Sequence, residues 1–198
     1  MKLLLATGNS NKLKEIRDKF LGIENLEILS LDDFKDSPDI IEDATTFDGN
    51  ALKKARIISE FTNLPVLSDD SGLEIDALQG KPGVYSARYA GENATDDDRN
   101  RLVLKEMREI PDDKRTAKFV CVIAIVFPDG REYIARGECE GIIVREKRGE
   151  NGFGYDPIFY LPHLKKTVAE LSFNEKNRIS HRAFALEKAI RILQRCNS

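Results

Sequence analysis

The first part of the chain alternates between apolar runs and helical spacing. Residues 3–6 and residues 26–31 are apolar runs that predict two buried strands. Between them, Leu13, Ile16 and Phe20 recur at the spacing of a helix with one buried face. Strand and helix therefore alternate here, which is typical of the α/β class.

The next segment combines an acidic stretch with two further helices. Residues 32–43 are acidic and irregular, and Thr45 with Asp48 is expected to cap the helix that follows. The apolar face of that helix consists of Phe47, Ala51, Ala55 and Ile58. Another helix is expected to start at Thr95, because the aspartates at 96–98 would lie in its first turn, where the helix dipole favours anions. We assign these aspartates to capping and solvent.

The second half begins with a pattern typical of a long antiparallel hairpin. Residues 116–127 are almost continuously apolar, and residues 132–140 contain alternating apolar and polar positions. A proline, an aspartate and a glycine at 128–130 favour a direct reversal of the chain between the two strands. Residues 142–144 can continue the second strand.

A glycine-rich loop and a final helix complete the pattern. The loop covers residues 149–156 and precedes a short strand at 158–160. His181 and Arg182 are expected to open the last helix, beside its apolar stripe. That stripe consists of Ile179, Ala183, Leu186, Ile190 and Leu193. The whole pattern predicts an α/β fold with a mixed sheet, in one domain over residues 1–198 without a separable linker.

Composition restricts the class of function. The chain has 198 residues, a formal net charge of −3, and 33% charged residues. Because nothing global attracts a polyanion, we expect no nucleic-acid partner. The apolar run at the amino terminus stops at Thr7, which is too early for a signal-peptide core or a membrane span. We expect a cytoplasmic protein without a membrane partner.

The cysteines do not indicate a metal centre. Cys121, Cys139 and Cys196 are scattered along the chain, and no CxxC pair occurs. An odd number of dispersed cysteines favours neither a disulfide framework nor a zinc site. Reduced thiols are therefore expected.

The most informative polar segment is the Asp-Asp-Ser-Gly sequence at residues 69–72. Apolar runs at 65–68 and 73–77 flank it, so we expect a tight loop between two core strands. Adjacent carboxylates repel each other and resist burial, which predicts a positive partner, with a divalent cation as the first candidate. A solvated Asp-Ser-Gly turn that needs no cation is the alternative.

A second polar segment links the first strand to the first helix and consists of Thr7, Gly8, Asn9, Ser10, Asn11 and Lys12. Backbone N–H groups at a helix start, together with the lysine charge, suit phosphate oxygens. The segment is not the GxxxxGK[ST] of a Walker loop, which disfavours ATPase-type chemistry. A plain helix cap, with Asn9 or Ser10 as the capping residue, is the alternative.

Residues 69–91 form one block, DDSGLEIDALQGKPGVYSARYAG, which resembles the inosine triphosphate pyrophosphatase family. The resemblance extends nearly from end to end. Four further motifs occur in the order of that family: Thr7-Gly8-Asn9 with Lys12 and Glu15; Phe47 with Asn50-Ala51 and Lys54-Ala55; GFGYDPIF at 152–159; and Ala169-Glu170-Leu171 with Lys176 and Ser180-His181-Arg182. Each motif is weak alone, but five in order over one domain length are a specific match.

The resemblance implies both a fold and an activity. The implied fold is an elongated, highly twisted mixed β-sheet flanked by helices, with two lobes and a central active-site cleft. The implied activity is Mg²⁺-dependent hydrolysis of ITP, dITP and XTP to the monophosphate and pyrophosphate. Such an enzyme would keep deaminated purines out of nucleic acids. A homodimer is implied as well.

The resemblance also implies roles for individual residues. Glu42 and Asp70 are expected to hold Mg²⁺, and Asp70 is expected to orient or deprotonate the attacking water. Glu42 is preferred over Asp43 because its distance from Phe47 along the chain fits the metal-binding glutamate of the family. The substrate-binding set consists of the 7–12 segment with Lys54, Ser71, Phe153, Gly154, Tyr155, Asp156, Lys176, His181 and Arg182.

Base recognition has a physical basis in the same residues. Phe153 and Tyr155 offer aromatic faces, and stacking of a base on such a face contributes roughly 1–3 kcal/mol. Both rings can instead belong to the core. Asp156 can accept from ring N–H groups, and Arg182 is expected to donate to the oxygen at position 6 of hypoxanthine or xanthine. Adenine has an amino group there and would leave that donor unpaired.

Two rival functions remain open. A non-catalytic nucleotide- or RNA-binding module would bind in a salt-sensitive way without metal or turnover, and the acidic balance speaks against it. A Maf-like pyrophosphatase for other modified nucleotides is the closer rival, although residues 153–156 and 180–182 favour the inosine type. Lys147 and Phe173 stand where many relatives have proline, which puts loop conformation in doubt more than activity.

Overall fold

The protein is described by a computed structural model over residues 1–196, and the chain divides into two compact units. The first unit consists of residues 1–70, residues 121–137 and the chain from Arg182 onward. The second unit consists of residues 71–120 and 138–181. Each unit has an apolar core of its own.

The strands form one mixed sheet in the order β2-β1-β3-β4-β5-β6-β7. β1 pairs in parallel with β2 and with β3, whereas β6 pairs antiparallel with β5 and with β7. The strands are β1 (Lys2–Leu5), β2 (Glu27–Ser30), β3 (Val66–Ile75), β4 (Thr116–Val126), β5 (Glu132–Ile143), β6 (Phe159–Leu161) and β7 (Lys166–Thr167). The predicted mixed sheet of the α/β class is confirmed, and so is the hairpin, whose second strand continues to Ile143.

The helices follow the predicted apolar faces closely. The α-helices of the described residues are α1 (Ser10–Phe20), α2 (Phe47–Thr62), α3 (Asp96–Glu106), α4 (Phe173–Ile179) and α5 (His181–Cys196). The predicted cap of α3 is confirmed, because Thr95 and Asp98 form a reciprocal capping box. None of these helices combines the length and the apolar character that a membrane span requires.

Three sequence-based expectations are wrong in detail. The cap of α2 is Thr46, whose hydroxyl accepts from the Gly49 amide, and not Thr45. Ile179 belongs to α4 rather than to the last helix, because Ser180 has extended backbone angles and separates the two. Residues 69–72 lie inside β3 and not in a loop, so the flanking apolar runs belong to one continuous strand.

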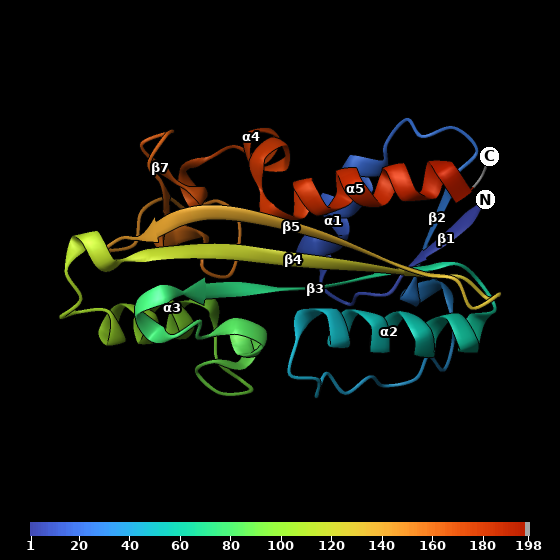
Figure 1. Cartoon of the computed structure of the whole chain (residues 1–198), viewed down its shortest axis with the longest axis horizontal. Helices are drawn as coiled ribbons and strands as arrows, with labels where there is room; N and C mark the ends of the chain where they lie inside the picture. Colours follow the sequence, from blue (N-terminus) through green and yellow to red (C-terminus); the bar gives the residue numbers. More distant parts are fainter. Residues whose placement is uncertain (197–198) are drawn as a thin grey trace. The chain divides into compact units, whose positions relative to one another are not determined.

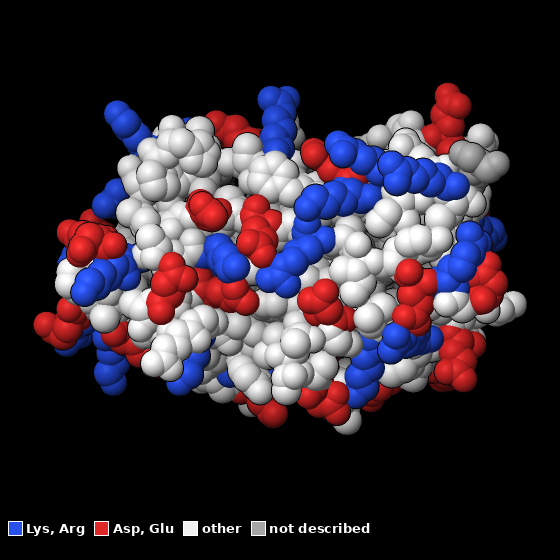
Figure 2. Space-filling view, viewed as in Figure 1, with Lys and Arg blue, Asp and Glu red and all other residues white. Residues whose placement is uncertain are grey.

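The first core lies between the strands and two helices. α1 and α5 contribute Ile16 and Leu186, which pack with Leu5 of β1 and Ile123 of β4. Figure 1 shows α2 on the other side of the strands of this unit. On the face drawn in Figure 2, basic side chains gather over the region of α5, so the exposed side of this amphipathic helix is positively charged.

The second core fills the other unit. It packs α3 through Val103 against the strand residues Leu73, Phe119 and Phe159. The segment between β5 and β6, which is the predicted glycine-rich loop, reaches this core through Tyr155. β3 and this loop also contain polar residues of the candidate site.

Candidate active site

In the first unit, Asp69 is the centre of a buried ion network. Its carboxylate accepts from Arg182 Nη2 at 3.1 Å, and Lys12 Nζ lies 3.0 Å from the same oxygen. Arg182 Nη1 also donates to Glu15 Oε2 at 2.5 Å. Asp69 is fully buried and Arg182 is 1% exposed. The network therefore joins β3 to α1 and α5 through charges that are buried at Asp69, Arg182 and Glu15 and partly exposed at Lys12.

Electrostatic compensation keeps this network ionised. Burial alone would raise the pKa of Asp69, but the charges of Lys12, Arg182 and Lys54 outweigh it and hold the pKa well below its usual range. Burial would likewise lower the pKa of Arg182, but the nearby carboxylate of Asp69 raises it further above its usual range. Asp69 and Arg182 are therefore both charged at neutral pH.

Asp70 is the next residue of β3 and has the opposite electrostatic character. Its Oδ2 accepts from Asn50 Nδ2 at 3.0 Å, and Asn50 Oδ1 in turn accepts from the Ala44 amide at 2.9 Å. Burial raises the pKa of Asp70 to about 6; the Asn50 hydrogen bond opposes the rise, and the nearby Glu42 carboxylate adds to it. Asp70 thus changes charge close to neutral pH, as a general base or acid needs to.

Glu42 and Lys54 complete the charged residues around Asp70. The Lys54 ammonium donates to Glu42 Oε1. Burial would lower the pKa of Lys54, but the charges of Asp69, Glu42 and Asp70 raise it overall. The buried ammonium is therefore protonated and lies among three carboxylates.

The segment from Thr7 to Lys12 forms a helix cap in this structure. Asn9 is the N-cap residue of α1, and its Oδ1 accepts from the amides of Asn11 and Lys12 at 3.0 Å and 3.1 Å. These are two of the N–H groups that we expected for phosphate oxygens. The structure therefore contains the alternative arrangement, and an anion would have to take the place of the Asn9 side chain to reach these two amides.

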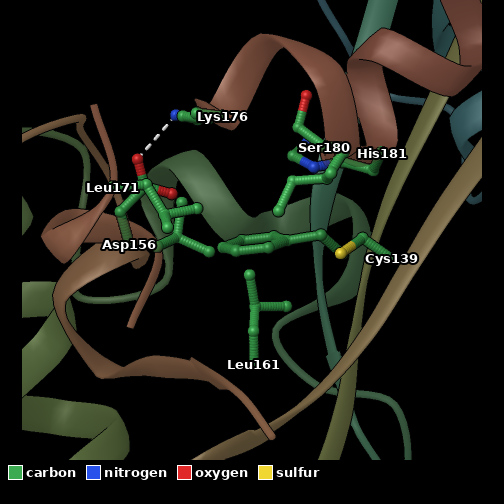
Figure 3. A pocket seen from close by; sticks show the side chains of 10 residues that line it. Cys139, Asp156, Leu161, Leu171, Lys176, Ser180 and His181 are labelled. Atoms are coloured by element: carbon green, nitrogen blue, oxygen red, sulfur yellow. Dashed lines mark hydrogen bonds and ion pairs between the residues drawn. The ribbon is translucent and has the colours of Figure 1, made fainter. Parts of the chain in front are cut away.

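In the second unit, Asp156 and Lys176 form a buried pair. Lys176 Nζ lies 2.6 Å from Asp156 Oδ2, which also accepts from the Phe153 amide at 3.0 Å. The same ammonium stands 4.3 Å from the centre of the Phe153 ring, a cation–π distance. Figure 3 shows Lys176 and Asp156 pointing toward each other from different segments. Phe153 is half-buried, so part of its ring remains exposed.

The cavity beside this pair is small. It has about 10 Å³, roughly the space of one water molecule. His181 forms part of its wall and stacks on Phe119, with ring centres 4.8 Å apart. Ser180 and Cys139 also border it, and burial raises the pKa of the Cys139 thiol to about 11. Ligand pockets are usually of the order of several hundred Å³, so a base cannot enter this cavity as it stands.

Helix α3 supports the glycine-rich loop in a way that the sequence analysis did not foresee. Asp96 Oδ2 accepts from the Gly154 amide at 2.6 Å, and Asn100 Nδ2 donates to the Gly154 carbonyl at 2.8 Å. We had assigned Asp96 to capping and solvent. Nothing in the chain around residue 96 indicates a contact with residue 154, so only the fold reveals it.

The remaining predicted residues have varied surroundings. Tyr155 lies in the second core, with its hydroxyl donating to the Ser86 carbonyl at 2.8 Å, so its ring is not an exposed face for a base. Ser71 is half-buried in β3. The donation from Arg182 to a base oxygen stays a prediction, since in this structure the guanidinium binds Asp69 and Glu15.

The acidic residues restrict the kind of metal site that the protein can offer. No group of three or more histidine, cysteine, aspartate and glutamate side chains arranged to hold a metal occurs among residues 1–196. Glu42 and Asp70 lie close enough for one carboxylate to raise the pKa of the other. This pair fits a cation such as Mg²⁺, which binds one or two protein carboxylates and completes its coordination shell with water and phosphate.

Replacement of Asp69 by asparagine should test the buried network. We expect Asp69→Asn to lower the free energy of unfolding by roughly 3–5 kcal/mol at about pH 7, because buried cations lose their counter-charge. Since the pKa of Asp69 is lower in the folded state, its contribution is complete above about pH 4 and is lost at more acidic pH. Urea unfolding between about pH 7 and pH 3 measures this. Exposed Asp113→Asn is the control, and an equal loss in both variants would contradict the assignment.

A second prediction concerns the loop that holds Asp156. An added Cβ at Gly152, where φ is +78°, would lie 2.0 Å from Asp156 Oδ2. Gly154 also has positive φ, but nothing lies within 4 Å of its Cβ position. Gly154→Ala should therefore cost only the left-handed backbone strain of about 1–2 kcal/mol. Gly152→Ala should cost clearly more, and identical unfolding free energies in the two variants would refute the clash.

Two curated proteins are similar to this chain over nearly its whole length. The dITP/XTP pyrophosphatase of Desulforamulus reducens is 51% identical over 195 residues, which cover 98% of this chain and 96% of that protein. The dITP/XTP pyrophosphatase of Geobacter sulfurreducens is 49% identical, over 93% of this chain and 92% of that protein.

Solved structures and a family model give the same result. A HAM1 protein from Coxiella burnetii matches with a TM-score of 0.91 and 46% identity, over 98% of this chain and 99% of that chain. The Ham1 protein of Staphylococcus aureus matches with a TM-score of 0.89 and 38% identity, over 98% of each chain. The model of the Ham1 family matches residues 3–192. The family resemblance of the motifs is thereby confirmed, and the chain belongs to the Ham1 family.

Proposed function

We propose that this protein hydrolyses nucleoside triphosphates of deaminated purines, ITP, dITP and XTP, to the monophosphate and pyrophosphate. The carrying observation is the cluster of Asp70, Glu42, Lys54 and Lys12, in a chain that is about half identical to proteins named dITP/XTP pyrophosphatase. Two carboxylates beside two lysines have the composition that phosphoryl chemistry with a divalent cation requires.

In this proposal, the first unit binds the phosphates. Lys12 and Lys54 are both held by carboxylates, so their ammonium groups are positioned before substrate arrives. Positioned cations of this kind stabilise charge that develops on a leaving pyrophosphate without further reorganisation. Lys54 would exchange its Glu42 partner for a phosphate oxygen, which frees the Glu42 carboxylate for a metal ion.

Glu42 and Asp70 would hold Mg²⁺, the cofactor that we propose. When bound, the ion neutralises phosphate charge and polarises the phosphorus–oxygen bond that breaks. Asp70 would orient the attacking water and accept its proton at a carboxylate oxygen. Asn50 fixes this carboxylate through Oδ2, so the position of Asp70 does not depend on the ligand.

The second unit would bind the base. The exposed part of the Phe153 ring offers a stacking face, and Lys176 and Asp156 offer a donor and an acceptor beside it. Because the adjoining cavity holds about 10 Å³, a base must displace side chains there. Lys176 and His181 are the donors of this unit that can reach an oxygen at position 6. Arg182 is a further proposed donor, provided that its guanidinium leaves Glu15 or Asp69.

A homodimer and a cytoplasmic location are part of the same proposal. Both rest on the family resemblance of the sequence motifs. We propose neither a nucleic-acid partner nor a membrane partner, in line with the net charge of −3.

Product analysis with a panel of nucleotides tests the proposed reaction. With Mg²⁺, ITP and XTP should give the monophosphate and pyrophosphate, identified by ³¹P NMR. We expect kcat/KM for ITP to exceed that for ATP by at least ~10²-fold, because adenine cannot satisfy a donor at position 6. Orthophosphate as the first product, or equal rates on ATP and ITP, would overturn the proposal. Salt-sensitive nucleotide binding without turnover would favour the binding module instead.

Variants of the carboxylates test the assigned roles. Asp70→Asn should keep the fold and lower kcat by ~10²–10⁴-fold, because the amide cannot accept the proton of the water. Glu42→Gln should raise the Mg²⁺ concentration needed for half-maximal rate. Asp43→Asn is its matched control, since Asp43 is exposed and its carboxylate pairs with Lys53. If Asp43→Asn changed the metal requirement and Glu42→Gln did not, the metal ligand would be Asp43.

A further inference from the structure

A groove lined almost entirely by cations lies in the second unit, on residues that have no part in the proposed reaction. It has about 510 Å³, within the range of small-molecule sites. Its walls consist of Arg101, Leu104, Lys105, Arg108, Arg115 and Arg145. We call it the basic groove. The only side chain in this set without a positive charge is Leu104.

Helical spacing produces one wall of the basic groove. Arg101, Leu104 and Lys105 lie on α3, and Arg108 follows just after its end (Figure 1). Arg101, Leu104 and Lys105 are three and four residues apart and therefore share one face of the helix, and Arg108 follows just beyond it. Lys105 and Arg108 have exposed side chains, and among the described residues neither forms an ion pair. Their position at the carboxyl end of α3 is favourable for the helix dipole, but that leaves their ammonium and guanidinium groups open to solvent.

Two arginines from other segments also line the basic groove, and both are held in place. Arg115 is 2% exposed and donates to the carbonyl oxygens of Met107, Ile143 and Val144, at 2.5, 2.7 and 3.0 Å. Arg145 donates to the Arg108 carbonyl at 3.2 Å. Neutral carbonyls orient the Arg115 guanidinium without cancelling its charge, so this cation is fixed in advance, whereas Arg145 is also paired with a carboxylate.

Acidic residues compensate this charge only in part. Asp112 lies 2.7 Å from Arg145 Nη2, and Asp97 lies 2.5 Å from Arg101 Nη2. Asp97 is also bound by Lys147, so its charge is shared. Neither aspartate lines the basic groove. Like charges this close repel each other, and an anion in the groove would relieve that repulsion.

We propose that the basic groove is a second anion site, which binds an oligophosphate chain. Guanidinium groups match phosphate oxygens in pairs, and five cationic side chains around one groove suit a ligand that carries several negative charges. No aromatic side chain lines the groove, so a nucleobase would find no stacking face. The chain can belong to free inorganic oligophosphate or to a nucleotide whose base stays in solvent. The site goes beyond the proposed hydrolytic reaction and does not depend on it.

Amide NMR with inorganic tripolyphosphate in metal-free buffer tests the proposal, because it reports the position of binding. We expect saturable shift changes at residues 101–108 and at Arg145. Arg108→Gln should weaken this binding by about tenfold, the effect of one charged hydrogen bond. Arg178→Gln is the matched control, an exposed arginine of the same unit, and should leave it unchanged. The rate of ITP hydrolysis without added tripolyphosphate should stay within twofold of the unsubstituted protein in both variants. Binding is measured by the NMR shifts alone, so the test remains valid even if the protein does not hydrolyse ITP.

Further arms distinguish the sources of the ligand. ATP and tripolyphosphate should bind the basic groove with similar affinity, because only the phosphates are recognised. ATP binding more than tenfold tighter would overturn the assignment to the phosphate chain. Shift changes that are linear and equal with chloride at the same ionic strength would mean screening only and would overturn the site. Binding of an RNA oligonucleotide without binding of tripolyphosphate would also overturn the site. The same holds if light scattering shows that Arg108→Gln dissociates a dimer while tripolyphosphate causes no shift changes.

Discussion

The buried ion pair between Asp69 and Arg182 is the interaction on which the first unit depends. Successive side chains of a strand point to opposite faces, so Asp69 and Asp70 are neighbours in sequence but have different surroundings. Asp69 meets Arg182 and Lys12, whereas Asp70 meets the neutral amide of Asn50. The pKa of Asp69 is therefore lowered, and that of Asp70 is raised to about 6. The strand thus resolves the repulsion between two adjacent acids by separating them.

A buried ion network of this kind is costly, and its location suggests why it is kept. Replacing buried charges with apolar side chains often leaves stability unchanged or improves it. Such a replacement at Asp69 would remove the counter-charge that holds Lys12 at 3.0 Å. Lys12 is one of the two cations that the proposed reaction requires at a fixed position. The network therefore holds the Lys12 ammonium in position more than it stabilises the core.

Local periodicity predicted most elements of the fold, and it failed where contacts between distant residues determine the backbone conformation. The apolar faces of α1 and α2 and the long hairpin follow from spacing alone, and the start of α3 follows from the aspartates of its first turn. Residues 69–72 looked like a loop because their side chains are polar, but charge compensation from distant helices allows them to continue β3. Ser180 separates α4 from α5 although the apolar stripe continues across it, because spacing does not report backbone angles.

For the candidate site, the motifs identified residues but not their partners. Family resemblance pointed to Asp156, Lys176 and Arg182, yet the pairing of Lys176 with Asp156 and of Arg182 with Glu15 required the structure. Tyr155 shows most clearly that residue type alone does not fix a role. An aromatic residue can stack on a base or belong to the core, and in the structure Tyr155 is buried in the core. A contact such as that of Asp96 with the Gly154 amide leaves no trace in the local sequence.

Net charge is a poor guide to anion binding in this protein for the same reason. A formal charge of −3 argues against a polyanion attracted by the whole surface. It does not argue against a groove, because electrostatic screening confines the effect of surface charges to about 10 Å at ordinary salt. Within that distance, helical spacing on α3 groups the cationic side chains, and the carbonyl contacts of Arg115 fix the position of its guanidinium. Local arrangement, and not overall balance, therefore determines where this chain can hold an anion.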